Sequence, residues 1–142
     1  IIAVSILLIT VTLFIILFLE TNSPAEPKLK MEFNPPPPWH TRMGQNLELN
    51  VTIENEGNSP AKNVNITLTA PVSFTILQSR KNKYSINFTK LEAAEKQNRT
   101  LSITIPGVIN PGNYTINTTI FAENVLEESY NYQITVELPY IP

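Results

Sequence analysis

The sequence contains no cysteine and no aspartate among its 142 residues. The absence of cysteine excludes disulfide bonds, thiol catalysis and thiolate metal sites, so a folded domain must be held by core packing and hydrogen bonds. Without aspartate, and with a single histidine, the chain offers no catalytic triad and no multi-histidine metal centre. The four glycines form no phosphate-binding loop and no EF-hand loop. We therefore expect neither an enzyme nor a cofactor.

Charge is also scarce. Ten basic and twelve acidic residues give a net charge of -2, and no long basic run is present. The densest basic cluster, at residues 80–83, is interpreted as a solvated loop, so we predict no nucleic-acid partner. The only histidine, His40, is expected to be packed or solvent-facing. Glu127 and Glu128 are adjacent and are interpreted as solvated charges rather than as a glycosidase carboxylate pair.

A long apolar run opens the sequence. Residues 1–19 carry no charge, and only Ser5, Thr10 and Thr12 are polar. A helix of this length spans about 29 Å, close to the ~30 Å hydrocarbon core of a bilayer. We predict a hydrophobic α-helix over residues 1–20, serving as a filament core or a membrane span. Its polymerisation residues are the apolar ones, namely Ile1, Ile2, Val4, Ile6, Leu7, Leu8, Ile9, Val11, Leu13, Phe14, Ile15, Ile16, Leu17, Phe18 and Leu19.

The remaining sequence changes from helical to strand-like patterning. Residues 21–27 are polar and contain two prolines, which predicts a hinge. From residue 28 onward, apolar and polar residues alternate, most clearly at Leu47, Leu49, Val51 and Ile53. Such alternation is typical of half-buried strands. It predicts an immunoglobulin-like β-sandwich over residues 28–142, with seven to eight antiparallel strands around residues 29–33, 47–53, 64–68, 74–76, 84–88, 101–105, 114–120 and 130–138.

Two local features refine this expectation. Four consecutive prolines at residues 35–38 predict a stiff polyproline II crossing. Tyr114 follows a turn that begins at Asn110. It occupies the place of a tyrosine-corner residue in such sandwiches, although an ordinary core tyrosine would fit the pattern equally.

The sequence contains six N-x-S/T sequons, where about three would arise by chance. Each asparagine falls in the polar phase of its predicted strand. A glycan is bulky and hydrophilic, so an acceptor must point toward solvent. Asparagine and threonine are also common on any polar strand face, which is the alternative interpretation. We predict N-linked glycans at Asn50, Asn65, Asn87, Asn98, Asn113 and Asn117.

The segment from Asn46 to Leu68 resembles the CARDB-like and related immunoglobulin-like modules of prokaryotic surface proteins. In those modules an alternating strand is followed by an Asn-x-Gly turn, here Asn55-Glu56-Gly57, and by a second strand. The later segments around Tyr114 and Tyr130 resemble the matching late strands. This resemblance implies a role in adhesion, spacing or assembly and names no ligand.

The apolar helix followed by such a head resembles archaeal type IV pilin-like proteins. Their peptidase leaves the apolar segment as the mature N-terminus, and their helices polymerise into a filament core. Bacterial type IV pilins carry glutamate at the fifth mature position, whereas archaeal relatives generally lack it. Ser5 therefore fits the archaeal branch. The resemblance implies glycosylated β-rich heads on the outside of a filament.

We expect a pilin, a structural subunit of an extracellular type IV-like pilus that serves surface adhesion. Its partners would be other copies of itself, the membrane before assembly, and N-linked glycans. The alternative is a single-pass, membrane-anchored cell-surface protein, stator-like or associated with a surface layer. A carbohydrate-binding module is a third hypothesis, but it needs exposed aromatics. Trp39 is the sole tryptophan, and Tyr130, Tyr132 and Tyr140 share a phase that we assign mainly to the core.

Overall fold

The computed structural model describes residue 12 and residues 24–141. The predicted helix over residues 1–20, with its polymerisation residues, and the first part of the predicted hinge lie outside the described residues, Thr12 excepted. Within the described part of the chain, no helix is long and apolar enough to span a membrane.

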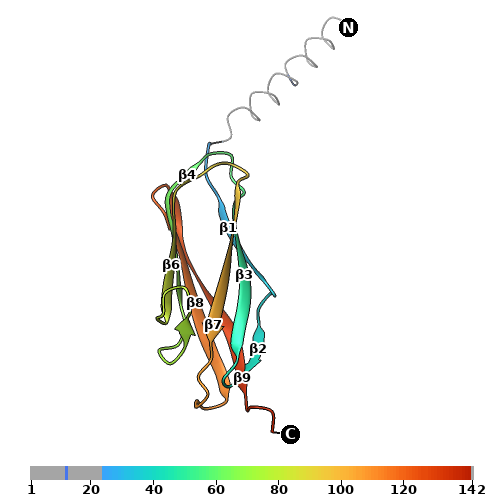
Figure 1. Ribbon diagram of the computed structural model, residues 1–142. Coiled ribbons are helices and arrows are strands. Elements are labelled where there is room, and N and C mark those ends of the chain that lie inside the picture. The colour runs from blue at the N-terminus through green and yellow to red at the C-terminus, as the bar shows by residue number, and fades with distance from the viewer. Residues whose placement is uncertain (1–11, 13–23, 142) are drawn as a thin grey trace, which may run out of the picture.

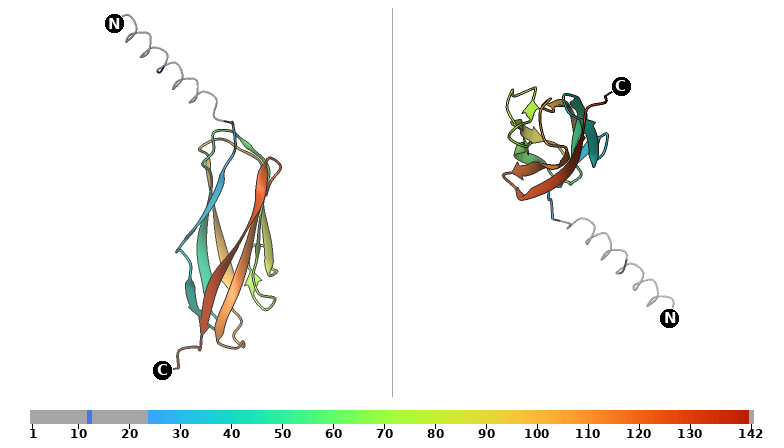
Figure 2. Two further views of the ribbon diagram at one scale, coloured as in Figure 1. Left: turned by 180° about the vertical axis from the view of Figure 1, so that it is seen from behind. Right: turned by 90° about the horizontal axis from the view of Figure 1, so that it is seen from below.

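Residues 29–137 form a β-sandwich of two sheets (Figure 1). The four-stranded sheet has the order β1-β3-β7-β5, and the five-stranded sheet has the order β2-β9-β8-β4-β6. The strands run along the long axis of the body, and the end at which β1 begins lies opposite the end at which the chain leaves β9 (Figures 1 and 2). Their bounds are β1 Leu29–Asn34, β2 Trp39–Arg42, β3 Asn46–Asn55, β4 Ala61–Thr69, β5 Thr75–Ile76, β6 Lys83–Leu91, β7 Lys96–Thr104, β8 Gly112–Ala122 and β9 Val125–Glu137.

The all-β sandwich is confirmed, but the expected strand number and the purely antiparallel pairing are wrong. The described residues form nine strands, and β2 pairs in parallel with β9. Strand β2 has only four residues and follows directly on the proline run. A strand that short shows too little alternation to be recognised from sequence.

The core lies between the sheets and follows the predicted alternation. The four alternating residues of β3 are all buried: Leu47, Leu49, Val51 and Ile53. Opposite them, the five-stranded sheet contributes a second buried layer that includes Val64, Ile66, Leu68, Ile116 and Ile134. Each fully buried side chain of this size stabilises the fold by roughly 1.5–3 kcal/mol. Packing of this kind holds the two sheets together without disulfides.

The proline run carries the chain from one sheet to the other. Strand β1 pairs with β3 in the four-stranded sheet, whereas β2 pairs with β9 in the five-stranded sheet. Residues 35–38 bend between them, and the Asn34–Pro35 and Pro37–Pro38 peptide bonds are cis. The predicted polyproline II crossing is therefore wrong. The indole Nε1 of Trp39 donates a hydrogen bond of 2.9 Å to the carbonyl of Pro35 and closes the bend.

Tyr114 forms a tyrosine corner, one of the two interpretations that its place in the sequence left open. Its hydroxyl donates a hydrogen bond of 2.5 Å to the carbonyl oxygen of Asn110, four residues upstream. The ring packs 5.2 Å from that of Phe74, which is buried in the core. The residue therefore combines a packed ring with a hydroxyl that fixes the turn before β8.

The Asn55-Glu56-Gly57 turn fastens the start of β1 to the body. The buried Asn55 side chain accepts hydrogen bonds from the backbone N–H groups of Lys28 and Gly57, and donates to the carbonyls of Ser59 and Leu91. A Cβ atom on Gly57 would lie 2.3 Å from the carbonyl oxygen of Glu26, so no larger residue fits there without a backbone shift. This is the physical reason for the Asn-x-Gly pattern in this chain.

The described end of the predicted hinge is held by the same turn. The backbone N–H of Glu26 donates to the Asn58 side-chain oxygen at 2.8 Å, and the carbonyl of Glu26 accepts from the Asn58 N–H at 3.1 Å. The carbonyl of Lys28 accepts from the N–H of Glu56 at 2.7 Å. Residues 26–28 are therefore bonded to the turn that follows β3.

Candidate functional site

The six sequon asparagines lie on the outer faces of both sheets. Asn50 and Asn98 belong to β3 and β7 of the four-stranded sheet. The other four belong to the five-stranded sheet. Five of the six side chains are exposed and Asn65 is half-buried. The set is Asn50, Asn65, Asn87, Asn98, Asn113 and Asn117.

The two sequons of the four-stranded sheet are paired with each other. Strands β3 and β7 are antiparallel, with Asn50 opposite Thr100 and Thr52 opposite Asn98. The Thr100 hydroxyl donates to the Oδ1 of Asn50 at 3.1 Å, and the Thr52 hydroxyl donates to the Oδ1 of Asn98 at 2.7 Å. Both bonds use the amide oxygen, whereas an N-linked sugar is attached to the amide nitrogen. The pairing is therefore compatible with a sugar on either residue.

The outer face of the five-stranded sheet carries many hydroxyl and amide side chains. One row runs across four strands through Ser85, Thr67, Thr119 and Ser129. Hydroxyl contacts join the first two residues at 3.2 Å and the last two at 3.3 Å. In the neighbouring row, Asn65 stands opposite Asn87 and donates a hydrogen bond to it. Two sugars at this pair would occupy adjacent positions on neighbouring strands.

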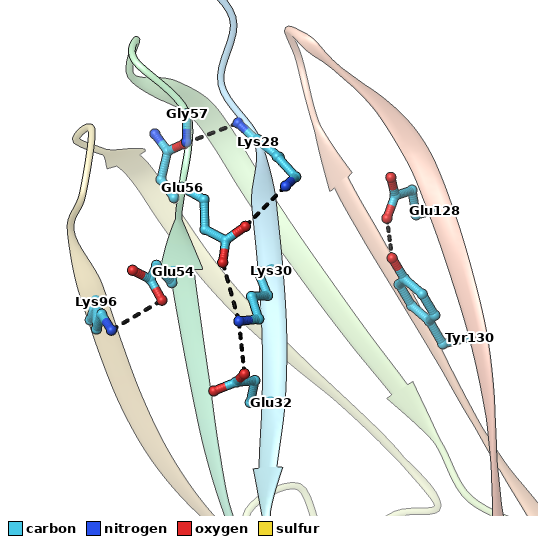
Figure 3. Close-up of polar contacts among 10 residues, drawn as sticks. Lys28, Lys30, Glu32, Glu54, Glu56, Gly57, Lys96, Glu128 and Tyr130 are labelled. Carbon is cyan, nitrogen blue, oxygen red and sulfur yellow. Dashed lines mark hydrogen bonds and ion pairs between the residues drawn. The ribbon is translucent and has the colours of Figure 1, made fainter.

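The outer face of the four-stranded sheet carries charges instead. The Lys30 ammonium lies 2.8 Å from the Glu32 carboxylate and 3.1 Å from that of Glu56, and Lys96 lies 3.1 Å from Glu54 (Figure 3). Hydrogen bonding to Glu32 and then to Glu56 raises the pKa of Lys30 above its usual range. Hydrogen bonds from Lys28 and Lys30 lower the pKa of Glu56. The pairs are exposed, so each stabilises the fold only weakly.

The candidate chemical groups singled out in the sequence are not brought together. His40, Glu127 and Glu128 are each exposed on the surface. Among the described residues, no group of three histidine, cysteine, aspartate or glutamate side chains could hold a metal ion. The expectations of no enzyme and no cofactor remain predictions.

The assignment of the tyrosines mainly to the core is wrong in part. Tyr132 is half-buried and packs against Phe33 and Trp39, with ring centroids 5.0 and 5.8 Å away. Tyr130 is 39% exposed and Tyr140 is 75% exposed. Both follow the apolar phase of β9, but the described residues place no strand over them.

Tyr130 belongs to a groove along the side of the sandwich that periodicity did not predict. The groove consists of three adjoining hollows of about 370, 370 and 310 Å³ between β1 and the first half of β9. Neighbouring hollows share lining residues. We call it the side groove, and its apolar lining comprises Leu29, Met31, Phe33, Val125, Leu126, Tyr130 and Tyr132. Sequence alone could not find it, because it depends on where β2 begins.

The two packed sheets define an immunoglobulin-like, CARDB-like β-sandwich domain. Residues 41–122 match the model of the NPCBM-associated family, the NEW3 domain of alpha-galactosidase. This match covers more than half of the chain, and the chain belongs to that family. No curated protein gives a significant match.

Solved structures show the same fold at low sequence identity. A CARDB domain from Pyrococcus furiosus, crystallised in complex with di-metal ions, is 17% identical with a TM-score of 0.56, covering 83% of this chain and 100% of its own. Alpha-2-macroglobulin from E. coli is 18% identical with a TM-score of 0.59, over 78% of this chain and 7% of that protein. A family 123 glycoside hydrolase from Clostridium perfringens is 15% identical with a TM-score of 0.51, over 80% of this chain and 28% of the enzyme. These similarities establish the fold alone.

Proposed function

We propose that the chain is a structural subunit of an extracellular, type IV-like pilus that displays a glycosylated β-sandwich head. The observation that carries the proposal is the placement of the sequons. All six acceptor asparagines lie on the outer faces of the two sheets, and none is buried. A head with glycans on the outer faces of both sheets is suited to display outside the cell, because glycans are bulky, hydrophilic surface groups.

The apolar segment over residues 1–20 supports the assembly part of the proposal. Packed against copies of itself, it would bury many large aliphatic and aromatic side chains, each contributing roughly 1.5–3 kcal/mol. This sum exceeds the cost of association. Within the described residues, the head contributes no catalytic arrangement that would require another explanation.

The assembly is tested by negative-stain microscopy of material sheared from cells. We expect filaments that an antibody against the head decorates along their length. Recovery of the chain only from detergent-solubilised membranes, with no filaments, would contradict the proposal. A cell that lacks the chain serves as the control for antibody specificity.

The glycan part is tested separately by mass spectrometry of glycopeptides. We expect a sugar at Asn98, which is exposed and lies near the start of β7. We expect a lower fraction of glycosylated molecules at Asn65. Asn65 is half-buried, lies on β4 between β6 and β8, and faces Asn87 directly. Unmodified peptides at all six positions would refute the glycosylated head. Equal occupancy at Asn65 and Asn87 on the same molecules would refute the crowding argument.

The second candidate is a single-pass, membrane-anchored surface protein with the same extracellular sandwich. The same apolar segment favours it, since its length also matches a bilayer. The residues that precede Ile1 in the precursor discriminate the two. A short basic leader ending in a small residue favours the pilin, whereas any other leader favours the anchor.

A further inference from the structure

The two sheets of the sandwich are separated along half of one side. Strand β9 is thirteen residues long, but β2 pairs with it only over residues 134–137. In the described part of the chain, no strand pairs with residues 125–133 on the side away from β8. Strand β1 is the edge strand of the other sheet, and its outer edge is likewise unpaired among the strands that the structure describes. Open edges of this kind are templates for an added strand.

Inward-facing side chains are uncovered at this opening. Tyr130 lies in the same alternating phase as the buried Ile134 and is 39% exposed, and Glu128 shares that phase. Leu126 lies beyond the register shift between Ile120 and Ala122, lines the same groove, and is 88% exposed. The side groove runs between them and Leu29 and Met31 of β1 (Figure 3 shows β1 and Tyr130 on its two sides). An extended strand with apolar side chains at alternate positions would cover these residues and complete the sandwich edge.

The same chain exposes a segment of that character at the opposite end of the body. After β9 come Leu138, Pro139, Tyr140 and Ile141, which carry no charge. Leu138 is 62% exposed, Tyr140 75% and Ile141 83%. Leu138 and Tyr140 are two residues apart, so in an extended strand both point to one face. Within one copy, this segment leaves the body at the end opposite the one at which β1 begins (Figures 1 and 2). The hollow of the side groove beside Leu126 lies at the start of β1, so the segment does not reach it in its own copy.

We propose that residues 138–141 of one copy add as a strand to the side groove of a second copy. The two copies would stack end to end. The segment would run parallel to the first half of β9, on the same side of β9 on which β2 pairs with residues 134–137. Leu138 and Tyr140 would fill the hollows beside Leu126 and Tyr130. In a parallel strand, successive residues bond to opposite sides, so Pro139 would turn its missing N–H away from β9.

Such a contact is heterologous, because two different patches of the same chain meet. Repetition of the contact produces a chain of subunits rather than a closed dimer. It involves only residues of the sandwich and the segment after β9, and it does not depend on how residues 1–23 assemble. The inference therefore goes beyond the proposed function and survives if the helix-based assembly fails.

The absence of native cysteine provides a direct test by disulfide cross-linking. Full-length chains carrying Leu126→Cys or Tyr140→Cys are purified separately in detergent, mixed, and oxidised mildly. We expect a mixed dimer of the two variants, several-fold more abundant than the mixed dimer of Tyr140→Cys with Ala93→Cys. Ala93 is an exposed residue at the same end of the body, in the turn between β6 and β7, and does not line the side groove.

Each other outcome contradicts the proposal. Equal cross-linking to Leu126→Cys and Ala93→Cys would show end-to-end contact without strand insertion. Cross-linking of Leu126→Cys mainly to itself would show pairing of two grooves. A second measurement avoids cysteine altogether: Tyr140→Ser should lower self-association in sedimentation experiments, whereas the matched exposed variant Val108→Ser should leave it unchanged.

Discussion

The two halves of β9 lie in different environments. In the second half, β2 lies alongside residues 134–137, and Ile134 and Val136 are buried. In the first half, Glu128 and Tyr130 hold the equivalent inward positions and line the side groove together with Leu126. The pattern of a strand therefore states which side chains could be buried. A neighbouring strand decides which of them are buried.

Apolar residues also have different roles in the two halves of β9. Buried residues in the closed half stabilise the single chain, because their area is removed from water on folding. Exposed apolar residues in the open half contribute little to that stability and are instead available to another strand. Substitutions in the two halves should therefore affect different measurements.

The largest expected effect is the loss of the aromatic cluster in the closed half. Trp39 is 2% exposed and its ring lies 5.1 Å from that of Phe33. We expect Trp39→Ala to lower the free energy of unfolding by about 3–5 kcal/mol. The matched variant in the open half, Leu126→Ala, should change it by less than about 0.5 kcal/mol. Urea denaturation followed by circular dichroism compares them, and similar losses would contradict the distinction between the halves.

The next effect concerns the turn that fixes β1 at the mouth of the side groove. Asn55→Ala leaves four backbone groups, those of Lys28, Gly57, Ser59 and Leu91, without their side-chain partner. We expect a loss of about 2–3 kcal/mol in the free energy of unfolding. Hydrogen exchange should show faster exchange at the Lys28 N–H. Asn58→Ala, at an exposed position, is the control and should cost clearly less; equal costs would disprove the role of burial.

A smaller, opposite effect is expected at Thr118, which faces inward on β8 opposite Tyr130. Its hydroxyl is buried and has no hydrogen-bond partner among the described residues. Thr118→Val keeps the shape, removes the unsatisfied group, and leaves the Asn117 sequon intact. We expect stabilisation by about 1 kcal/mol, measured by urea denaturation. Destabilisation would show that the hydroxyl is satisfied in solution.

The smallest effect is a titration that reports on the open half itself. A hydrogen bond to the Glu128 carboxylate, followed by partial burial, raises the pKa of Tyr130 from 10.0 to about 12. The neutral phenol is favoured in the folded state, so its contribution to stability is present below pH 10 and is lost as the pH rises toward 12. Phenolate absorbance should show this late titration, and Glu128→Gln should move it toward 10. An unchanged titration would exclude the Glu128 contact.

Much of the fold could be predicted from local patterning. Period-two alternation located β3 and the other long strands, because burial of one face imposes that period on any half-buried sheet. Tyr114 could be placed as a tyrosine corner, since its position after the Asn110 turn is a local feature. The outward direction of the sequon asparagines followed from the same phase. Strand β2 could not be found, because four residues after a proline run carry no measurable period.

The sequence by itself determined which residues can face inward, where turns occur, and that the fold must hold without disulfides. These properties depend on side-chain chemistry and on the strand repeat, which are local. Only the tertiary structure decided three further features: the chain changes sheets at residues 35–38, the sequons of Asn50 and Asn98 lie side by side, and residues 125–133 of β9 pair with β8 alone among the described strands. Those facts depend on which strands meet, and strand pairing joins residues far apart in the chain.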